Sequence, residues 1–328
     1  MTFRIDTYNQ KYLPGMTALY NAETAYEAHI APLTPERFIT LVEQKSYFDP
    51  GGLFVALEGG QVVGWIHACV AAGSEGGHDP AQKAPRIRML IYPREQLKVG
   101  RDLVAEATNW LKLSGQVRFL AMHAQLGYPF YRGLWVGGEP MCPVTLPHVH
   151  LALETGGYKN TQESIFMAAE MTSPPPLERP RRGEVAPATA IEFVEAPAEM
   201  KHEPMRESWI GFEPLRTRVF VGQEEAGSIG WVIQPHLDRL GAPCLNIWSL
   251  GVKETYRRRG LASALVARAM ARGYALGARF ASVGTQLWNA PAHATYAKLG
   301  YRPYCLVVGR TLNLSRKGTY LETNGERG

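Results

Sequence analysis

The sequence predicts a duplicated α/β fold, in which two similar domains follow one another along the chain. Three observations support this prediction: a proline-rich segment near the middle, the same order of strands and helices on both sides of it, and a Gly-Tyr pair at corresponding places. A repeat of this length indicates that one structural unit occurs twice. The expected boundaries are a first domain over residues 1–171, a linker over 172–185 and a second domain over 186–328.

The linker is centred on the stretch 172–184, which reads TSPPPLERPRRGE. Proline has no N–H group and a fixed φ angle, so this stretch can neither extend a sheet nor continue a helix. The two segments that it separates each have the size of an ordinary domain.

Each half is expected to begin with a hairpin, in which two apolar runs flank a turn. The predicted strands are Leu53–Leu57 and Val62–Ile66 in the first half, and Val219–Val221 and Gly227–Val232 in the second. Each hairpin contains a Gly-Trp pair, Gly64-Trp65 and Gly230-Trp231, which strengthens the case for a repeat.

Both halves then continue as strand, turn, helix, strand, helix, Gly-Tyr and strand. The predicted elements are the strands Ile87–Tyr92 and Val117–Met122 and the pair Gly157-Tyr158 in the first half, and Leu245–Val252, Phe280–Thr285 and Gly300-Tyr301 in the second. The apolar faces of the first predicted helices carry Leu103, Ala107 and Leu111, and Leu261, Leu265 and Ala269. The first half also contains two insertions, 71–85 and 131–149.

The composition is that of a soluble globular protein, with 45% hydrophobic and 20% charged residues and a net charge of +5. Its basic residues form no long stripe with interleaved aromatics, which argues against nucleic-acid binding. Four scattered cysteines without a CxxC motif indicate neither a disulfide framework nor a zinc site. Because the sequence has no signal-like start and no long apolar run, we expect a cytoplasmic protein without a membrane segment.

A basic turn between strand and helix is the strongest functional signal. The segment 252–265 reads VKETYRRRGLASAL, so a strand ends, three arginines follow, and a helix starts near Gly260. The first turn of a helix presents unpaired N–H groups and the positive end of the dipole, which together bind anions. Gly260 lets a phosphate oxygen approach the backbone closely, and the arginines add charged hydrogen bonds.

This turn resembles the pyrophosphate loop of the GCN5-related N-acetyltransferase (GNAT) superfamily, Gln/Arg-x-x-Gly-x-Gly/Ala, with Arg257, Gly260 and Ala262 at the defining positions. The later segment 288–301, WNAPAHATYAKLGY, resembles a second motif of that superfamily. The resemblance implies that each domain is a mixed β-sheet flanked by helices, with a splayed strand pair. It also implies acetyl-CoA (coenzyme A) as co-substrate, bound between the strands 245–252 and 280–285.

The resemblance assigns roles residue by residue. The residues that it implies for binding acetyl-CoA are Leu250, Val252, Arg257, Arg258, Arg259, Gly260, Leu261, Ala262, Ser263 and Asn289. Asn289 also fits a helix N-cap, and both roles are compatible. Tyr296 matches the tyrosine that, in many relatives, protonates the departing thiolate; its alternative is a half-buried packing tyrosine.

The base that would accept the proton of the acceptor amine departs from the family pattern. Many relatives use a glutamate on the strand before the loop, and 245–252 has no carboxylate. Glu225, Asp238, His293 or a chain of waters are the alternatives, and a surface position is the plainer interpretation of His293.

Two groups of residues are weighed for the acceptor side. Trp248 and Trp288 either line it or pack inside the protein, and packing is the commoner fate of tryptophan. Glu203, Glu207 and Glu213 could attract a cationic amine, although solvated surface acids are the plainer interpretation.

The first half is expected to have lost its site. Aligning Gly100 with Gly260 puts Leu97 in place of Arg257 and Asp102 in place of Ala262, where a carboxylate would repel a diphosphate. The insertion 131–149 is also expected to replace the second motif in this half. This half would pack against the active copy and close one wall of the acceptor site. His148 and His150 have no third ligand nearby, so no metal site is predicted.

The sequence therefore predicts an N-acetyltransferase that transfers an acetyl group directly from acetyl-CoA to an amine of a small molecule or peptide, in a ternary complex, at one site in the second half. The alternatives are a non-catalytic CoA-binding sensor and a protein or peptide N-acetyltransferase. No nucleic-acid or membrane partner is expected, a homodimer is left open, and the acceptor is not specified by the sequence.

Overall fold

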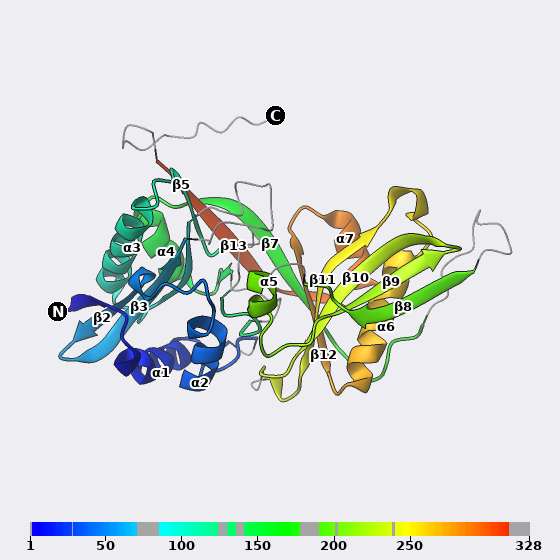
Figure 1. The fold of residues 1–328 in the computed structure, drawn as a ribbon, viewed down its shortest axis with the longest axis horizontal. Helices are drawn as coiled ribbons and strands as arrows, with labels where there is room; N and C mark the ends of the chain where they lie inside the picture. The colour runs from blue at the N-terminus through cyan, green and yellow to red at the C-terminus, as the bar shows by residue number, and fades with distance from the viewer. Residues whose placement is uncertain are drawn as a thin grey trace.

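The predicted tandem α/β fold is confirmed by the computed structural model, which describes residues 2–27, 29–70, 85–123, 130–135, 141–177, 190–200, 203–237 and 240–314. Both halves contribute to a single sheet, and helices cover its faces (Figure 1). The insertion 71–85 lies almost wholly outside the described residues, as does the second part of the linker.

The first half contains seven strands and four α-helices within the described residues. Its strands are β1 (Arg4–Thr7), β2 (Leu53–Glu58), β3 (Gln61–Cys69), β4 (Arg86–Ile91), β5 (Arg118–Ala121), β6 (Cys142–Pro143) and β7 (Lys159–Glu170). Its helices are α1 (Leu13–Glu23), α2 (Pro35–Phe38), α3 (Leu97–Lys112) and α4 (Pro147–Thr155).

The second half repeats this order in shorter form. Its strands are β8 (Ile191–Pro197), β9 (Leu215–Val221), β10 (Glu224–Gln234), β11 (Cys244–Val252), β12 (Phe280–Gln286) and β13 (Arg302–Asn313). Its helices are α5 (Glu203–Ser208), α6 (Leu261–Ala275) and α7 (Ala290–Ala297).

The two halves exchange their last strands. The strand order is β1-β2-β3-β4-β5-β13-β7-β12-β11-β10-β9-β8, so β13 lies beside β5 of the first half and β7 lies beside β12 of the second. The strands β7 and β13 pair with each other along most of their length and run diagonally between the halves (Figure 1). The division into domains at 172–185 stays a prediction, but the sheet itself continues across it.

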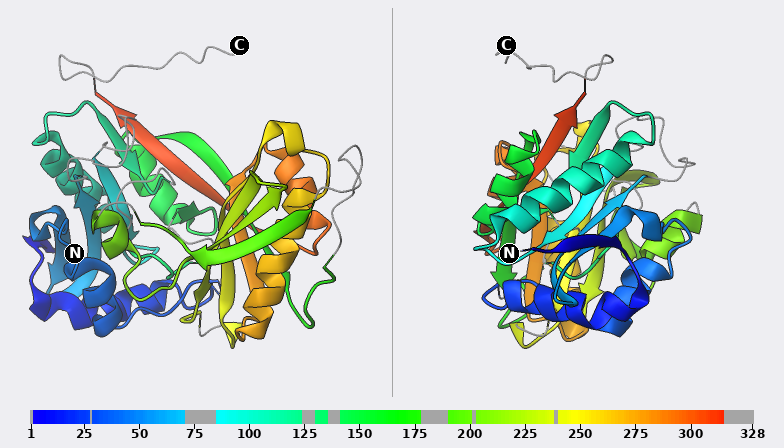
Figure 2. Two further views of the ribbon diagram at one scale, coloured as in Figure 1. Left: turned by 45° about the vertical axis from the view of Figure 1, so that its right-hand side comes forward. Right: turned by 90° about the vertical axis from the view of Figure 1, so that its left-hand side faces the viewer.

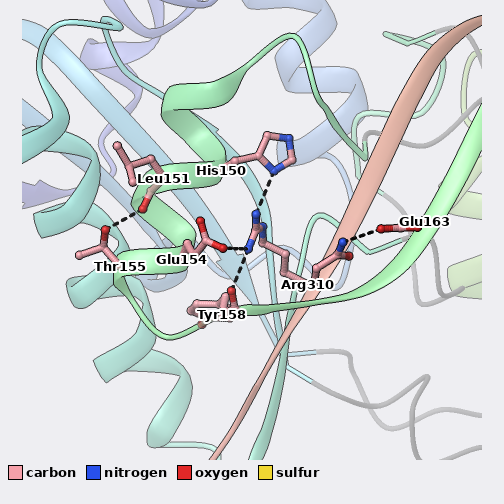
Figure 3. A network of polar contacts seen from close by, with 8 residues as sticks. His150, Leu151, Glu154, Thr155, Tyr158, Glu163 and Arg310 are labelled. Atoms are coloured by element: carbon pink, nitrogen blue, oxygen red, sulfur yellow. Dashed lines mark hydrogen bonds and ion pairs between the residues drawn. The ribbon is translucent and has the colours of Figure 1, made fainter. Parts of the chain in front are cut away.

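Arg310 holds the exchanged strand β13 inside the first half (Figure 3). Its side chain is 7% exposed, and its guanidinium donates to the Tyr158 carbonyl at 3.0 Å and lies 3.6 Å from the Glu154 carboxylate. The ring of His150 completes the group, with Nδ1 3.4 Å from the guanidinium. A buried charge is stable only when it is paired and hydrogen-bonded, which these three contacts provide.

The helices of each half lie on defined faces of the sheet. On the first half, α1 accepts a hydrogen bond from Trp65 on one face, and α3 packs over Gly64 on the other. On the second half, α6 packs against β9, β10 and β11, and α7 lies beside it. The opposite face of this half meets the first half instead, since Leu237, Cys244 and Phe280 join the core of the first half.

The structure confirms the repeat that the Gly-Tyr pairs predicted. Gly157 and Gly300 both have a φ of 86°, and each is followed by a buried tyrosine, Tyr158 or Tyr301. The Gly-Trp pairs, in contrast, are not equivalent, because Trp65 bonds to α1 whereas Trp231 packs in the core that includes α6. The match between the two Gly-Trp pairs was therefore a coincidence of sequence.

No helix in the described parts of the chain is long and apolar enough to cross a membrane. The four cysteines are free, and none is paired with another.

Candidate active site

The strands β11 and β12 part in the middle of the second half, as the resemblance implied. They pair in parallel from Cys244↔Phe280 to Ile247↔Val283 and no further, although both strands continue. Beyond this point β11 bulges against β10, and Ser249 adopts a φ of 55°. A bulge of this kind bends a strand and increases its twist. The edge of β11 that faces β12 is therefore unpaired at Leu250 and Val252, both half-buried, so it can bind a ligand.

The basic turn closes the same end of β11. Gly260 is the N-cap of α6, with a φ of 78°, a conformation that favours glycine. Helix α6 begins at Leu261 and has no acidic residue in its first turn. The amide groups of Leu261, Ala262 and Ser263 thus form a helix N-terminus with the features of an anion site.

Two of the three arginines have contacts that shape the turn. The Arg257 guanidinium donates to the Val252 carbonyl at 3.3 Å, and the Arg259 guanidinium lies 5.3 Å from the centroid of the Tyr256 ring. Arg258 has a φ of 63° and is exposed. Contacts within the turn therefore stabilise its conformation, while its charged groups stay accessible to solvent.

Tyr296 lies on α7, under the parted strands. It is 4% exposed and packs against Tyr301, with ring centroids 5.5 Å apart. Burial raises the pKa of Tyr296 to about 12. The Tyr296 hydroxyl makes no hydrogen bond within the described part of the chain, so it remains free to donate to a ligand.

Asn289 has the structural role that the sequence offered as one alternative. Its side chain accepts a hydrogen bond from the Ala292 amide at 3.3 Å and so caps α7. His293, one turn later, is hydrogen-bonded to the Gln286 carbonyl at 3.1 Å, at the end of β12.

The expectation that both tryptophans pack inside the protein is wrong for Trp288. Its side chain is 77% exposed, because it lies in the turn between β12 and α7 and no element covers it. Trp248 is half-buried and stacks on Trp209 of the segment after α5, with centroids 5.4 Å apart.

None of the side chains suggested as the base for the acceptor amine lies on the parted strands β11 and β12. Glu225 lies 3.7 Å from Arg218, and Asp238 lies outside the described residues. Asn246, the polar side chain at the buried start of β11, donates to the Ser282 hydroxyl at 3.1 Å. The base therefore stays unassigned, with His293 or water as the remaining alternatives.

The three glutamates 203, 207 and 213 do not gather over the parted strands. Glu203 is paired with Arg206, and the Glu207 carboxylate accepts a hydrogen bond from the Ser46 amide at 2.7 Å. Glu213 lines a cavity of about 550 Å³ near Leu276, at the C-terminal end of α6. That cavity lies about 22 Å from the basic turn, at 1.5 Å per residue of α6, so it is not the diphosphate site.

The first half meets the second around α5, which lies in front of the sheet between the halves (Figures 1 and 2). Arg132 donates to the Ser208 carbonyl at 3.1 Å, and its guanidinium lies 3.7 Å from the centroid of Trp209. The Lys45 ammonium donates to the Glu207 carbonyl. The first half thus supports the Trp209–Trp248 pair, a contact that no local pattern in the sequence could reveal.

The turn before α3, which corresponds in the first half to the basic turn before α6, has a different structure. Helix α3 begins at Leu97, so Gly100 lies within the helix and the alignment of Gly100 with Gly260 was wrong. Gly100 packs under Tyr92, whose ring would lie 2.3 Å from a Cβ at this position. Asp102 is likewise a helix residue and pairs with Lys98 at 2.6 Å. The turn before α3 therefore lacks a glycine cap, because Gln96 is the N-cap, and it carries one arginine, Arg94, where the turn before α6 carries three.

The first half also lacks the tyrosine. The insertion 131–149 does not replace the second motif, because its last residues begin α4, the counterpart of α7. The amides of Tyr158 and Tyr301 bond to the carbonyls of Leu153 and Tyr296, so Leu153 occupies the position of Tyr296. No group of three metal-binding side chains occurs among the described residues, and His148 packs on Tyr92 instead.

Comparison with known proteins agrees with this geometry. Residues 187–301 match the model of the acetyltransferase (GNAT) family. The fold resembles a GCN5-related N-acetyltransferase from Sphaerobacter thermophilus, with a TM-score of 0.64, 13% identity and 95% of each chain covered. It also resembles a tandem GNAT protein from the clavulanic acid biosynthesis pathway, with a TM-score of 0.63, 14% identity and coverage of 95% of this chain and 98% of that one. No curated protein matches the sequence.

The parted strands and the basic helix N-terminus lie within residues 187–301, the part of the chain whose match places it among the GNAT acetyltransferases. The fold of the whole chain is similar to that of a tandem GNAT protein, and the part that matches the GNAT acetyltransferase family lies in the second half.

Proposed function

We propose that this protein transfers an acetyl group from acetyl-CoA to an amine of a small molecule or peptide, directly and in a ternary complex, at a single site in the second half. The observation that carries the proposal is that the parted strands of this half meet a glycine-capped helix N-terminus preceded by three arginines. The cytoplasm is the compartment proposed for this reaction.

The residues present fit acetyl-CoA. The positive φ of Gly260 exposes the first amides of α6, and no carboxylate lies in the first turn of this helix to repel a diphosphate. Arg257, Arg258 and Arg259 would neutralise its charge. The unpaired edge of β11 at Leu250 and Val252 would bond to the amide-bearing arm, and Asn289 would cap α7 beside it.

Acetyl-CoA would supply the activated acetyl group. In the overall reaction a C–N bond forms as the C–S bond breaks, the amine loses a proton and the sulfur gains one. Tyr296 would hold a proton at the departing sulfur, since its raised pKa keeps the phenol protonated at every physiological pH. Histidine 293 or water would take the proton from the amine.

Calorimetry with acetyl-CoA tests the binding site. The double variant Arg257→Glu, Gly260→Asp reverses one charge and adds a carboxylate, so acetyl-CoA binding should be lost while the fold is kept. Unchanged affinity in a folded double variant would remove the turn from the site.

A CoA-binding sensor is the alternative, favoured by the absence of a carboxylate on the described strand β11. Release of free CoA with a panel of amines and peptides separates the two. Binding of acetyl-CoA without acetylation of any of them would support the sensor, whereas reaction with peptides alone would support a peptide N-acetyltransferase.

A further inference from the structure

Three residues stand side by side across the second half, close to the point where its strands part. Arg216 on β9 pairs with Gly230 on β10, which pairs with Trp248 on β11. Because Gly230 has no side chain, the Trp248 indole lies over it; a Cβ at Gly230 would approach the ring to 2.6 Å. The Arg216 guanidinium reaches the same ring, 5.2 Å from its centroid. Arg216 is thus held beside the bulge at Ser249.

Arg216 has no carboxylate partner in the described part of the chain. Its polar contact is with the Ser228 hydroxyl at 3.0 Å. The neighbouring Arg218, in contrast, lies 3.6 Å from Glu199 and 3.7 Å from Glu225. A guanidinium has five N–H donors, so Arg216 keeps donors for a ligand. Its planar fork binds a carboxylate through two parallel hydrogen bonds.

The surroundings of the indole pair are positive. Arg132 covers the ring of Trp209, and Lys45 lies within the same contact between the halves. Burial, together with the charge of Arg132, lowers the pKa of Lys45 to about 8. Glu203 is paired with Arg206, and the Glu207 carboxylate, which accepts a hydrogen bond from the Ser46 amide, offsets one of the positive charges of Arg132, Lys45 and Arg216. This region therefore favours an anionic group of the ligand over a cationic one.

We propose that the acetyl acceptor is an amine that also bears a carboxylate, and that Arg216 binds this carboxylate. The inference rests on the proposed function. Trp248 and Leu250 are two residues apart, which is at most about 6.6 Å along a strand and less across the bulge at Ser249. A carboxylate on Arg216 therefore leaves its amine near Leu250 when only a few bonds separate the two groups. Amino acids and short ω-amino acids have this chemistry.

The experiment compares matched acceptors in the full-length protein. Free CoA and acetylated product are measured with the twenty L-amino acids, β-alanine and γ-aminobutyrate, each against its carboxamide. The variants are Arg216→Gln, Arg216→Lys and the control Arg268→Gln. Arg268 is matched because it also stacks on a ring, 3.9 Å from the centroid of Phe193, but belongs to α6 on the other face of the sheet. Circular dichroism and acetyl-CoA calorimetry accompany each variant.

We expect the best carboxylate-bearing amine to exceed its carboxamide at least tenfold in kcat/KM. Arg216→Gln should remove this preference, mainly through KM, with acetyl-CoA affinity and the carboxamide rate unchanged. Arg216→Lys should keep part of it, and Arg268→Gln all of it. Equal kcat/KM values for carboxylate-bearing amines and their carboxamides would overturn this inference and leave the proposed function intact. An Arg216→Gln variant that loses the same factor in kcat/KM for both would do the same. If acetyl-CoA binds and no amine reacts, the proposed function fails, and this assignment fails with it.

Discussion

Tyr296→Phe removes the hydroxyl that is proposed to protonate the departing thiolate and leaves the buried ring in place. General acid catalysis is worth about 10²- to 10⁴-fold in rate. Burial raises the pKa of Tyr296 from 10.0 to about 12, which weakens the acid by about 3 kcal/mol, since each pKa unit corresponds to about 1.4 kcal/mol. We therefore expect kcat to fall about 100-fold, near the lower end of that range.

The assay is CoA release at saturating acetyl-CoA, with Tyr301→Phe as the matched control. Tyr301 is the ring that packs on Tyr296, and its buried hydroxyl has no hydrogen-bond partner within the described residues. Removing that hydroxyl should leave kcat unchanged and should not lower stability. A Tyr296→Phe variant within threefold of the wild-type kcat would refute the acid role.

The raised pKa also fixes the shape of the pH profile. As pH rises the acceptor amine loses its proton, so kcat/KM should increase and then level off. Tyr296 stays protonated until the pH approaches 12, so no loss of activity near pH 10 should come from it. A fall near pH 10 that disappears in Tyr296→Phe would contradict the effect of burial.

Three further predictions concern charges outside the reacting centre. Arg310→Met should destabilise the protein by about 2 to 4 kcal/mol in urea unfolding, because it breaks a buried charge network; a loss below 1 kcal/mol would argue against the network. The pKa of Lys45 is lowered to about 8, so wild-type stability should rise between pH 8 and 10.5, and Lys45→Met should flatten this rise, by at most about 3 kcal/mol. Asp102→Ala should leave acetyl-CoA affinity unchanged in calorimetry, whereas tighter binding would indicate a second site in the first half.

The elements that the sequence predicted well are those with a local pattern. The strands around Leu53–Leu57 and Phe280–Thr285 are short apolar runs bounded by turn residues, and α6 carries an apolar face at helical spacing. The basic turn was predictable for the same reason, since glycine, arginines and a helix start are adjacent in the chain. Each of these features is encoded within about fifteen residues.

The features that escaped prediction depend on distant contacts. The exchange of β7 and β13 follows from sheet edges more than a hundred residues apart, which no local pattern in the chain encodes. Arg132 and Trp209 meet only because the halves pack around α5. Gly100 was misaligned because sequence does not distinguish a glycine packed under a ring from one with a positive φ.

The exchange of strands also imposes an order on folding. The first half leaves the ribosome early, yet the place between β5 and β7 is filled only by Arg302–Asn313, near the end of the 328-residue chain. Pairing over such long separations is slow, because the entropy of closing the loop is lost before the contacts form. The first half therefore remains an incomplete folding intermediate until β13 has been synthesised. Neither half should reach its native state when it is expressed without the other.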